Sequence, residues 1–182
     1  MVSPLVRRRT VTAYWLIPTE PAYCSFKGII NDLAGRYHAP VFEPHVTIHA
    51  GAADADAASR ALGDAVRECT QITLNPTRID QSEEFTKTLF VEFAMTAELR
   101  QLNELMRNTA HASSQYELKP HLSLLYKKMA AETRRDLAAS IKVPLWEVTF
   151  GAIKAVRCIS PTRFRADVEA WRVIEAVSLC DR

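Results

Sequence analysis

The chain has 182 residues, of which 48% are hydrophobic and 24% are charged, and its 23 basic and 21 acidic side chains leave a formal net charge of +2. This length fits one domain, or two small lobes with a shared core. So balanced a charge argues against bulk binding to nucleic acid or to a membrane surface, and no apolar run approaches the ~18 residues that a bilayer-spanning helix needs.

The N-terminal segment and the cysteine pattern predict a cytoplasmic location. Arg7, Arg8 and Arg9 lie near the N-terminus, but no apolar stretch of the kind found in a secretory signal follows them. The cysteines are scattered, without a Cys-x-x-Cys pair: Cys24, Cys69, Cys158 and Cys180. We therefore expect reduced and buried thiols, while disulfides are the alternative that an even number leaves open.

Strands and amphipathic helices alternate through the first part of the chain. The apolar run Val11 to Ile17 predicts a buried strand that ends before Pro18. Apolar residues at helical spacing predict a helix from Pro21 to Tyr37, and a second strand runs from about Phe42 to Gly51. Asp54 is suited to cap the next helix. The inner face of that helix consists of small and aliphatic residues: Ala58, Ala61, Leu62, Ala65 and Val66.

The second part of the chain repeats a similar order of elements. Gln71 to Asp80 and Thr88 to Ala94 are predicted strands, joined by a polar stretch over residues 81–84, and Thr96 can cap the helix that follows. The remaining expected elements are a polar loop from His111 to Gln115, a short strand at His121, a helix from Glu132 to Ser140, a strand from Pro144 to about Val156, and a last strand from Trp171 to Leu179. Two halves of similar plan are what an ancient duplication would leave.

One short motif occurs in both halves. Its first copy is His45-Val46-Thr47-Ile48 after Pro44, and its second is His121-Leu122-Ser123-Leu124 after Pro120. The alternation in each copy is typical of a strand with one buried face. Because residues i and i+2 of a strand point to the same side, His45 shares a face with Thr47, and His121 with Ser123. Two such strands can present two imidazoles and two hydroxyls to one cleft.

This paired motif resembles the signature of the two-histidine (2H) phosphoesterase superfamily. Within that superfamily, the stretches from Phe42 to Thr47 and from Pro120 to Tyr126 resemble the cyclic phosphodiesterase branch of plants and yeast. The resemblance implies an α+β fold with a single bilobal domain over residues 1–182. In this duplicated fold, two antiparallel sheets flanked by helices form interleaved lobes around a central cleft, with the motif strands near 42–50 and 120–126.

The chemistry of a cyclic phosphodiester explains these residue types. Hydrolysis needs a base for the attacking water, an acid for the departing ring oxygen, and stabilisation of charge on the other phosphate oxygens. Histidine, with an ordinary pKa of about 6.5, can fill either proton role. The sequence therefore predicts His45 and His121 as catalytic residues, and Thr47 and Ser123 as phosphate-binding residues. The resemblance further implies that His121 is the base and His45 the acid.

Tyr126 is a further candidate, since the resemblance implies that it lines the phosphate site. Strict alternation places Tyr126 on the opposite face of its strand from His121, so a bulge or the end of the strand must turn it inward. Packing in the core or on the surface of a lobe is the alternative. By the same alternation His49 shares the face of His45, which leaves the mouth of the cleft or the protein surface as its place.

No metal site is expected. On a strand, His45 and His49 lie ~13 Å apart, which is too far for one metal ion, and no third ligand has suitable spacing. We likewise expect no other cofactor. Trp15, Phe85 and Trp146 are candidates either for stacking against a base or for the core. Lys87, Arg157 and Arg163 are candidates for positive charge in the cleft.

The predicted function is a metal-independent cyclic phosphodiesterase, monomeric and unattached to a membrane. The resemblance implies small substrates, namely 2′,3′-cyclic nucleotides or ADP-ribose 1″,2″-cyclic phosphate. It implies a phosphomonoester product, of the 2′-phosphate type for the nucleotides and ADP-ribose 1″-phosphate for the second substrate. One alternative is an enzyme of the same superfamily that processes RNA ends, such as a 2′–5′ RNA ligase or a 3′-end phosphodiesterase. The other is a module that binds cyclic phosphates or RNA ends without turnover.

Overall fold

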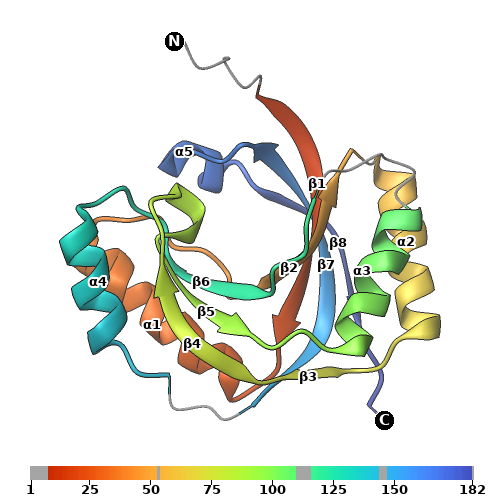
Figure 1. The fold of residues 1–182 in the computed structure, drawn as a ribbon. Coiled ribbons are helices and arrows are strands. Elements are labelled where there is room, and N and C mark those ends of the chain that lie inside the picture. Colours follow the sequence, from red (N-terminus) through yellow and green to blue (C-terminus); the bar gives the residue numbers. More distant parts are fainter. Residues whose placement is uncertain (1–7, 53, 110–115, 144–146, 182) are drawn as a thin grey trace.

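The computed structural model describes residues 8–52, 54–109, 116–143 and 147–181, and the elements below lie within these ranges (Figure 1). The strands are β1 (Arg9–Pro18), β2 (Val46–Gly51), β3 (Ile72–Leu74), β4 (Pro76–Gln81), β5 (Leu89–Phe93), β6 (His121–Leu125), β7 (Val148–Ser160) and β8 (Arg172–Ser178). The helices are α1 (Ala22–Tyr37), α2 (Ala55–Glu68), the short 3-10 helix η1 (Phe85–Lys87), α3 (Ala97–Thr109), α4 (Ala131–Ser140) and α5 (Arg165–Glu169).

All eight strands join in one antiparallel sheet, in the order β3-β7-β1-β2-β6-β5-β4, with β8 paired to β7. The predicted α+β class is therefore confirmed, but the two expected sheets are the halves of a single one. The physical reason lies at the two motif strands. β2 and β6 run next to each other and pair through Val46 and Leu122, so the halves are continuous across a junction one residue pair wide.

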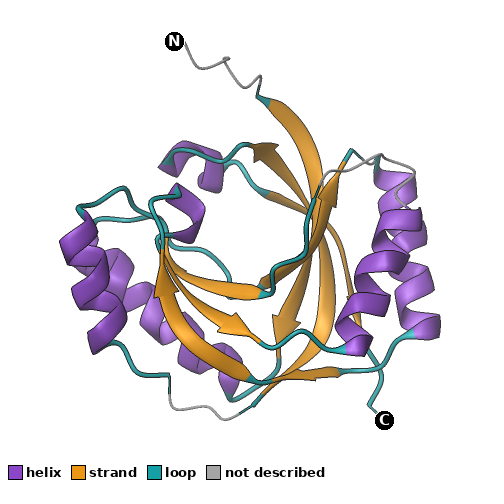
Figure 2. Ribbon diagram, viewed as in Figure 1, coloured by secondary structure: helices purple, strands orange, loops and turns teal. Residues whose placement is uncertain are grey.

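The longer helices α1, α2, α3 and α4 cover the outer side of the sheet in two groups (Figure 2). α1 and α4 pack against the half made of β4, β5 and β6, whereas α2 and α3 pack together against β2, β7 and β8. α1 precedes β2 in the chain yet lies against β6, and α3 precedes β6 yet lies against β2. Each half of the sheet is thus covered by a helix from the other half of the chain.

The sequence patterns explain why these helices form where they do. α1 begins after Pro21 and buries one face, through Phe26, Ile30 and Leu33 among others. The side chain of Asp54 accepts a hydrogen bond from the backbone N–H of Ala57 at 2.8 Å, as expected of a cap. Thr96 caps α3 in the same way, with its hydroxyl 3.2 Å from the N–H of Leu99. In the described residues, no helix is both long and apolar enough to cross a membrane.

Three local expectations need correction. The strand expected over Gln71 to Asp80 is two strands, because β3 pairs with β7 and β4 pairs with β5, so the chain passes between the sheet halves at Asn75. β2 begins at Val46 rather than near Phe42, since Pro40 and Pro44 have no N–H to donate to a ladder. α5 was not expected, because five residues are too few for a helical period. The loop expected at 111–115 lies outside the described residues.

The cysteines are all free, as expected, but not all buried. Cys158 is buried, Cys69 is half-buried, and Cys24 and Cys180 are exposed. Burial raises the pKa of the Cys158 thiol to about 12. That thiol is therefore protonated at neutral pH and unreactive as a nucleophile.

Candidate active site

A bulge in β2 decides which side chains of the first motif face the site. Tyr14 of β1 pairs with His49, but the next residue, Trp15, pairs with Thr47, so Ile48 is an extra residue in β2. Thr47 consequently shares a face with Trp15 on the inner side of the sheet. Ile48 and the following His49 both turn to the outer side, against the helices, and Ala50 returns to the inner side.

The second motif has the same bulge at the equivalent residue. Phe90 of β5 pairs with Ser123 while Leu89 pairs with Leu125, so Leu124 is the extra residue in β6. Leu124 and Leu125 both lie in the core under the helices, and Tyr126, which follows the end of the strand, lines the same cavity as Ser123. The bulge thus brings Tyr126 to the face of His121, which strict alternation would not do.

Both histidine rings are oriented by a backbone carbonyl two residues earlier. Nδ1 of His45 lies 2.6 Å from the carbonyl oxygen of Glu43, and Nδ1 of His121 lies 2.7 Å from that of Lys119. A carbonyl can only accept, so each neutral imidazole carries its proton on Nδ1. Each Nε2 then has a free lone pair. The two motifs therefore hold their histidines in the same tautomer.

The motif residues line one cavity of about 670 Å³ between the sheet halves, a volume suited to a small-molecule ligand. All five candidates predicted from the sequence are in its wall: His45, Thr47, His121, Ser123 and Tyr126. Thr47 lies in β2, and His121 and Ser123 lie in β6. His45 directly precedes β2, and Tyr126 directly follows β6. The structure thus brings the predicted residues together, from stretches far apart in the chain.

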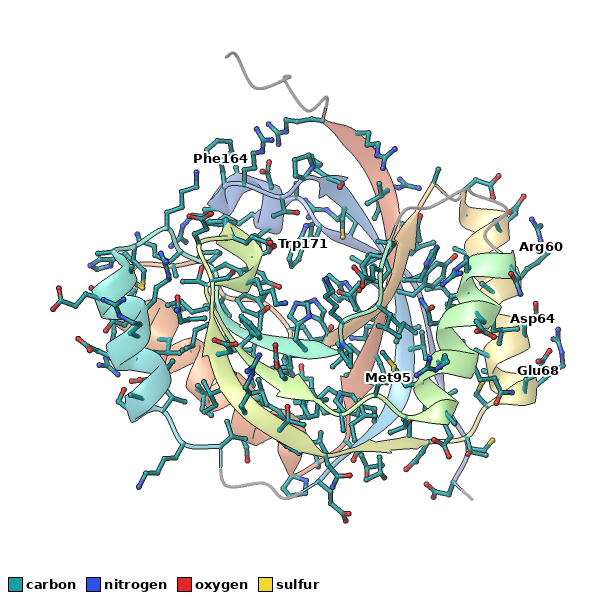
Figure 3. All side chains as sticks on the ribbon, viewed as in Figure 1. Arg60, Asp64, Glu68, Met95, Phe164 and Trp171 are labelled. Atoms are coloured by element: carbon teal, nitrogen blue, oxygen red, sulfur yellow. The ribbon has the colours of Figure 1, made fainter. Side chains whose placement is uncertain are left out.

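The first histidine lies among aromatic rings. His45 stacks on Trp15 with ring centroids 3.8 Å apart and planes 13° apart. Trp171 stands edge-on to both, at 6.2 Å from His45 and 5.1 Å from Trp15. In Figure 3, Trp171 points into the space between the sheet halves, whereas Phe164 lies at the outer edge of the molecule. Burial in this setting, with a smaller contribution from the charge of a protonated His121, lowers the pKa of His45 to about 4, against the opposing effect of the hydrogen bond to the Glu43 carbonyl.

The second histidine lies nearer to charged groups. The ring of His121 meets that of Phe90 at a steep angle, with centroids 5.5 Å apart, and Nζ of Lys87 lies 4.4 Å from the centre of the same Phe90 ring. Burial is the largest cause that lowers the pKa of His121, and the Lys87 ammonium adds to it, while the Glu84 and Glu92 carboxylates act in the opposite direction. Both histidines are consequently neutral in the empty site at pH 7.

The hydroxyl groups of the second motif form a chain. Ser123 donates to the carbonyl oxygen of Thr86 at 2.8 Å, which ties β6 to η1. The hydroxyls of Tyr126 and Ser123 are also hydrogen-bonded, an effect that opposes the rise in the pKa of Tyr126 caused by burial. The Tyr126 ring stacks on Phe42 at 3.8 Å. Tyr126 is thus held on both its ring and its hydroxyl.

His49 occupies neither of the places expected for it. It is completely buried on the outer side of the sheet, with its ring 6.3 Å from Tyr14 and 5.8 Å from Tyr116, and its two ring nitrogens have no hydrogen-bond partner among the described residues. The bulge at Ile48 is the cause, since it reverses the alternation on which the expectation rested. In the part of the chain that the structure describes, no group of three or more His, Cys, Asp and Glu side chains is placed to hold a metal ion.

Several residues of the cavity wall were not singled out by sequence reasoning. Trp171 and Lys128 belong to this group, and Phe42, which supports Tyr126, was noted only as part of the motif. No periodic or motif signal marks a lone aromatic residue in a loop as part of a site. Of the stacking candidates, Trp15 and Phe85 line the cavity and Trp146 lies outside the described residues. Of the three side chains expected to bring positive charge to the cleft, Lys87 and Arg163 line the cavity, and Arg157 is not among the described residues of its wall.

Comparisons with known proteins match nearly the whole chain. Residues 11–179 match the sequence model of the family "cyclic phosphodiesterase-like protein". The chain is similar to the cyclic phosphodiesterase of Arabidopsis thaliana, with 25% identity over 178 residues that cover 96% of each chain.

Solved structures show the same fold. E. coli LigT complexed with 3′-AMP matches with a TM-score of 0.57 and 17% identity, over 96% of this chain and 99% of LigT. The protein TT0787 of Thermus thermophilus matches with a TM-score of 0.60 and 14% identity, over 94% of this chain and 98% of its own. At these identities the likeness is one of fold.

Proposed function

This chain belongs to the cyclic phosphodiesterase-like family of 2H phosphoesterases and is a phosphodiesterase. We propose that it hydrolyses 2′,3′-cyclic nucleotides to the nucleoside 2′-phosphate, or ADP-ribose 1″,2″-cyclic phosphate to ADP-ribose 1″-phosphate. One observation carries the proposal. Two imidazoles, from repeated motifs and in the same tautomer, line a single cavity together with two hydroxyl residues and a tyrosine.

The proposed reaction is an in-line displacement at phosphorus. Nε2 of His121 takes a proton from water as the water oxygen bonds to phosphorus, and protonated His45 gives its Nε2 proton to the departing ribose oxygen as the P–O bond breaks. His45 is neutral in the empty site, so it needs the bound substrate to become an acid. The negative charge of a phosphodiester favours the imidazolium form and raises the pKa of His45.

The hydroxyl groups have the complementary task. Thr47 and Ser123 are proposed to donate hydrogen bonds to the non-bridging phosphate oxygens, on which charge grows in the transition state. Ser123 donates to Thr86 in the empty site, so its hydroxyl must rotate towards the phosphate. The hydroxyl of Tyr126 is hydrogen-bonded to that of Ser123, so we expect the two hydroxyls to reorient together when the phosphate binds.

The rest of the cavity suits a nucleotide. Trp15, Trp171 and Phe85 line it and offer apolar ring surface to a base or to adenine. Cationic side chains that can meet further phosphate groups, as in ADP-ribose, also line it: Lys87, Lys128 and Arg163. Glu83 and Glu84 lie in the same wall and limit its net positive charge, which favours a small substrate over a long nucleic-acid strand.

The test is turnover without metal. Purified protein is incubated with 2′,3′-cyclic AMP in EDTA, and the product is identified by phosphorus NMR. We expect adenosine 2′-phosphate, and a loss of kcat of about 10²- to 10⁴-fold in either His45→Ala or His121→Ala. His38→Asn is the matched control, since His38 ends α1 in a left-handed conformation (φ 50°) that asparagine also tolerates.

The other outcomes separate the alternatives. Activity that EDTA abolishes and a divalent metal restores would contradict metal independence. Tight binding without turnover would favour the binding module, and turnover confined to oligonucleotides with a cyclic phosphate end would favour RNA-end processing. Unchanged activity in both histidine variants would remove the mechanism.

A further inference from the structure

We propose that Glu43, held by Lys154 and Tyr23, is a positioning residue that keeps the His45 ring in its working orientation. This proposal rests on the role given above to His45. It concerns the segment that precedes the first motif, which the repeated motif itself does not explain.

The backbone directly before His45 lies outside the hydrogen-bond ladder of the sheet. Residues 39–45 belong to no helix or strand, and Pro40 and Pro44 have no N–H to donate. Yet the carbonyl oxygen of Glu43 is the group that accepts from Nδ1 of His45, at 2.6 Å. Any shift of this peptide therefore rotates the imidazole or breaks its hydrogen bond.

The side chain of Glu43 ties this backbone to other parts of the fold. Nζ of Lys154 lies 2.7 Å and 2.9 Å from its two carboxylate oxygens, and the hydroxyl of Tyr23 donates to one of them at 3.3 Å. The side chains of Glu43 and Lys154 are only 22% and 25% exposed. Bonds between charged groups are the stronger ones, and partial burial reduces their screening by salt.

These contacts tie the segment to two elements on which the site is built. Lys154 lies in β7 and pairs across the sheet with Trp15, the residue on which His45 stacks. Tyr23 lies in α1, and Lys27 of the same helix donates to the carbonyl oxygen of Phe42 at 3.0 Å. The position of the His45 ring is thus fixed relative to β1, β7 and α1 together.

The second motif has no matching arrangement among the contacts of the described residues. In the second motif, the carbonyl of Lys119 accepts the hydrogen bond from the histidine, as that of Glu43 does in the first. The Lys119 side chain, however, pairs with Glu117, two residues away on the same segment, and both side chains are exposed. This pair cannot tie the segment to another element. It offers a matched control, because one of its members, Lys119, precedes His121 by two residues, as Glu43 precedes His45.

Position, not charge, is what Glu43 contributes. The causes that shift the pKa of His45 include its backbone hydrogen bond to Glu43 but not the Glu43 carboxylate. Weakening the ion pair should therefore act on the orientation of the imidazole, and it should change the pKa of His45 only through the hydrogen bond to the Glu43 carbonyl, whose loss lowers that pKa. This separates a positioning role from an electrostatic one.

The test uses three variants: Glu43→Gln, Lys154→Met and the double variant that combines them. Glu117→Gln is the control. With 2′,3′-cyclic AMP we expect each single variant to lose roughly 10- to 100-fold in kcat, with a much smaller change in KM, since misplacement by about 1 Å can have an effect of this size. The double variant should lose little more than the worse single one, because both remove the same interaction. Glu117→Gln should stay within about twofold of wild type in kcat, and its pH profile should match that of wild type.

A second measurement does not depend on turnover. Nitrogen-15 NMR of the imidazole should show His45 as the Nδ1–H tautomer in wild type and in Glu117→Gln, and a mixture of tautomers in Glu43→Gln, in protein shown to be folded by circular dichroism. An unchanged tautomer and kcat in Glu43→Gln would overturn the proposal, as would a shift of the pH profile without loss of kcat. If wild type does not turn over the cyclic phosphate, the tautomer measurement still decides the positioning role while the proposed function fails by itself.

Discussion

At the scale of single residues, the two histidines are alike in their hydrogen bonds and different in their surroundings. Each donates from Nδ1 to a carbonyl, but His45 packs among aromatic rings, whereas His121 lies near Lys87, Glu84 and Glu92. Burial is the main cause of the lowered pKa in both. The reaction needs one proton shared between the pair, so the pH dependence of catalysis follows from these shifts.

The first prediction concerns that pH dependence. The profile of kcat/KM reports the free enzyme, in which both pKa values lie below the ordinary value of about 6.5. We expect kcat/KM to be highest below pH 6.5 and to decline by roughly tenfold per pH unit on the alkaline side. The optimum of kcat should lie at higher pH, because the bound phosphate raises the pKa of its neighbouring imidazole. Profiles of both constants with a cyclic nucleotide test this; a kcat/KM that stays level from about pH 6.5 to 8 would contradict it.

The sequence was most informative at this scale, and its limits there are specific. The repeated His-apolar-hydroxyl pattern placed His45, Thr47, His121 and Ser123 in one cavity, because alternation over three residues survives in both strands. It could not place Tyr126 or His49, since the bulges at Ile48 and Leu124 depend on how the partner strands pair. Trp171 contributes to the cavity from a loop, where no periodicity marks it.

At the scale of elements, the two motif strands are copies down to their irregularity. Each has one extra residue directly after the hydroxyl residue, which makes His49 the counterpart of Leu125. Leu125 is apolar and packs in the core, whereas His49 is buried with two ring nitrogens that have no partner among the described residues. A buried polar group without a hydrogen bond costs about 1–3 kcal/mol.

The second prediction follows from this comparison. His49→Leu, which gives the first strand the residue of the second, should increase the free energy of unfolding by about 1 kcal/mol or more and leave kcat nearly unchanged. Leu125→His, the reverse exchange, should lower it by a similar or larger amount. Urea denaturation of the two variants and wild type measures both effects; a less stable His49→Leu would mean that His49 has a partner in solution.

At the scale of the whole molecule, the fold class could be predicted and the joining of its parts could not. The order of elements and the 2H resemblance indicated an α+β fold around a cleft, and the family match and the solved structures confirm it. The single sheet depends on one residue pair, Val46 and Leu122, which no local pattern marks. The division of the expected strand at Asn75 into β3 and β4 could not be predicted for the same reason, because an apolar alternation does not indicate which partner a strand pairs with.

The third prediction is a loss of stability in acid. His45, His49 and His121 all have lowered pKa values in the folded protein, with burial as the main cause. The unfolded chain therefore binds more protons below about pH 6.5, so stability is complete above that pH and is lost as the pH falls towards about 4. For His45, whose pKa is about 4, the loss by that pH is about 3 kcal/mol.

Denaturation of wild type and His45→Gln at several pH values from about 7 down to about 4 measures this contribution. The variant should lose less stability across that range than wild type does, because its amide does not titrate. Parallel curves for the two proteins would show that His45 is more easily protonated in the folded state than its burial suggests.

The long-range pairing of β1 with β7 and the packing of helices on the opposite half of the sheet have a consequence for biosynthesis. β1 is made first, yet it pairs with β7 from Arg9 to Pro18, opposite residues 150–160. Nearly the whole polypeptide must leave the ribosome before the earliest strand meets its longest partner. A nascent chain halted at Asn75 would expose α1 without β6 and β2 without α3, so it should attract chaperones, not work as a smaller enzyme.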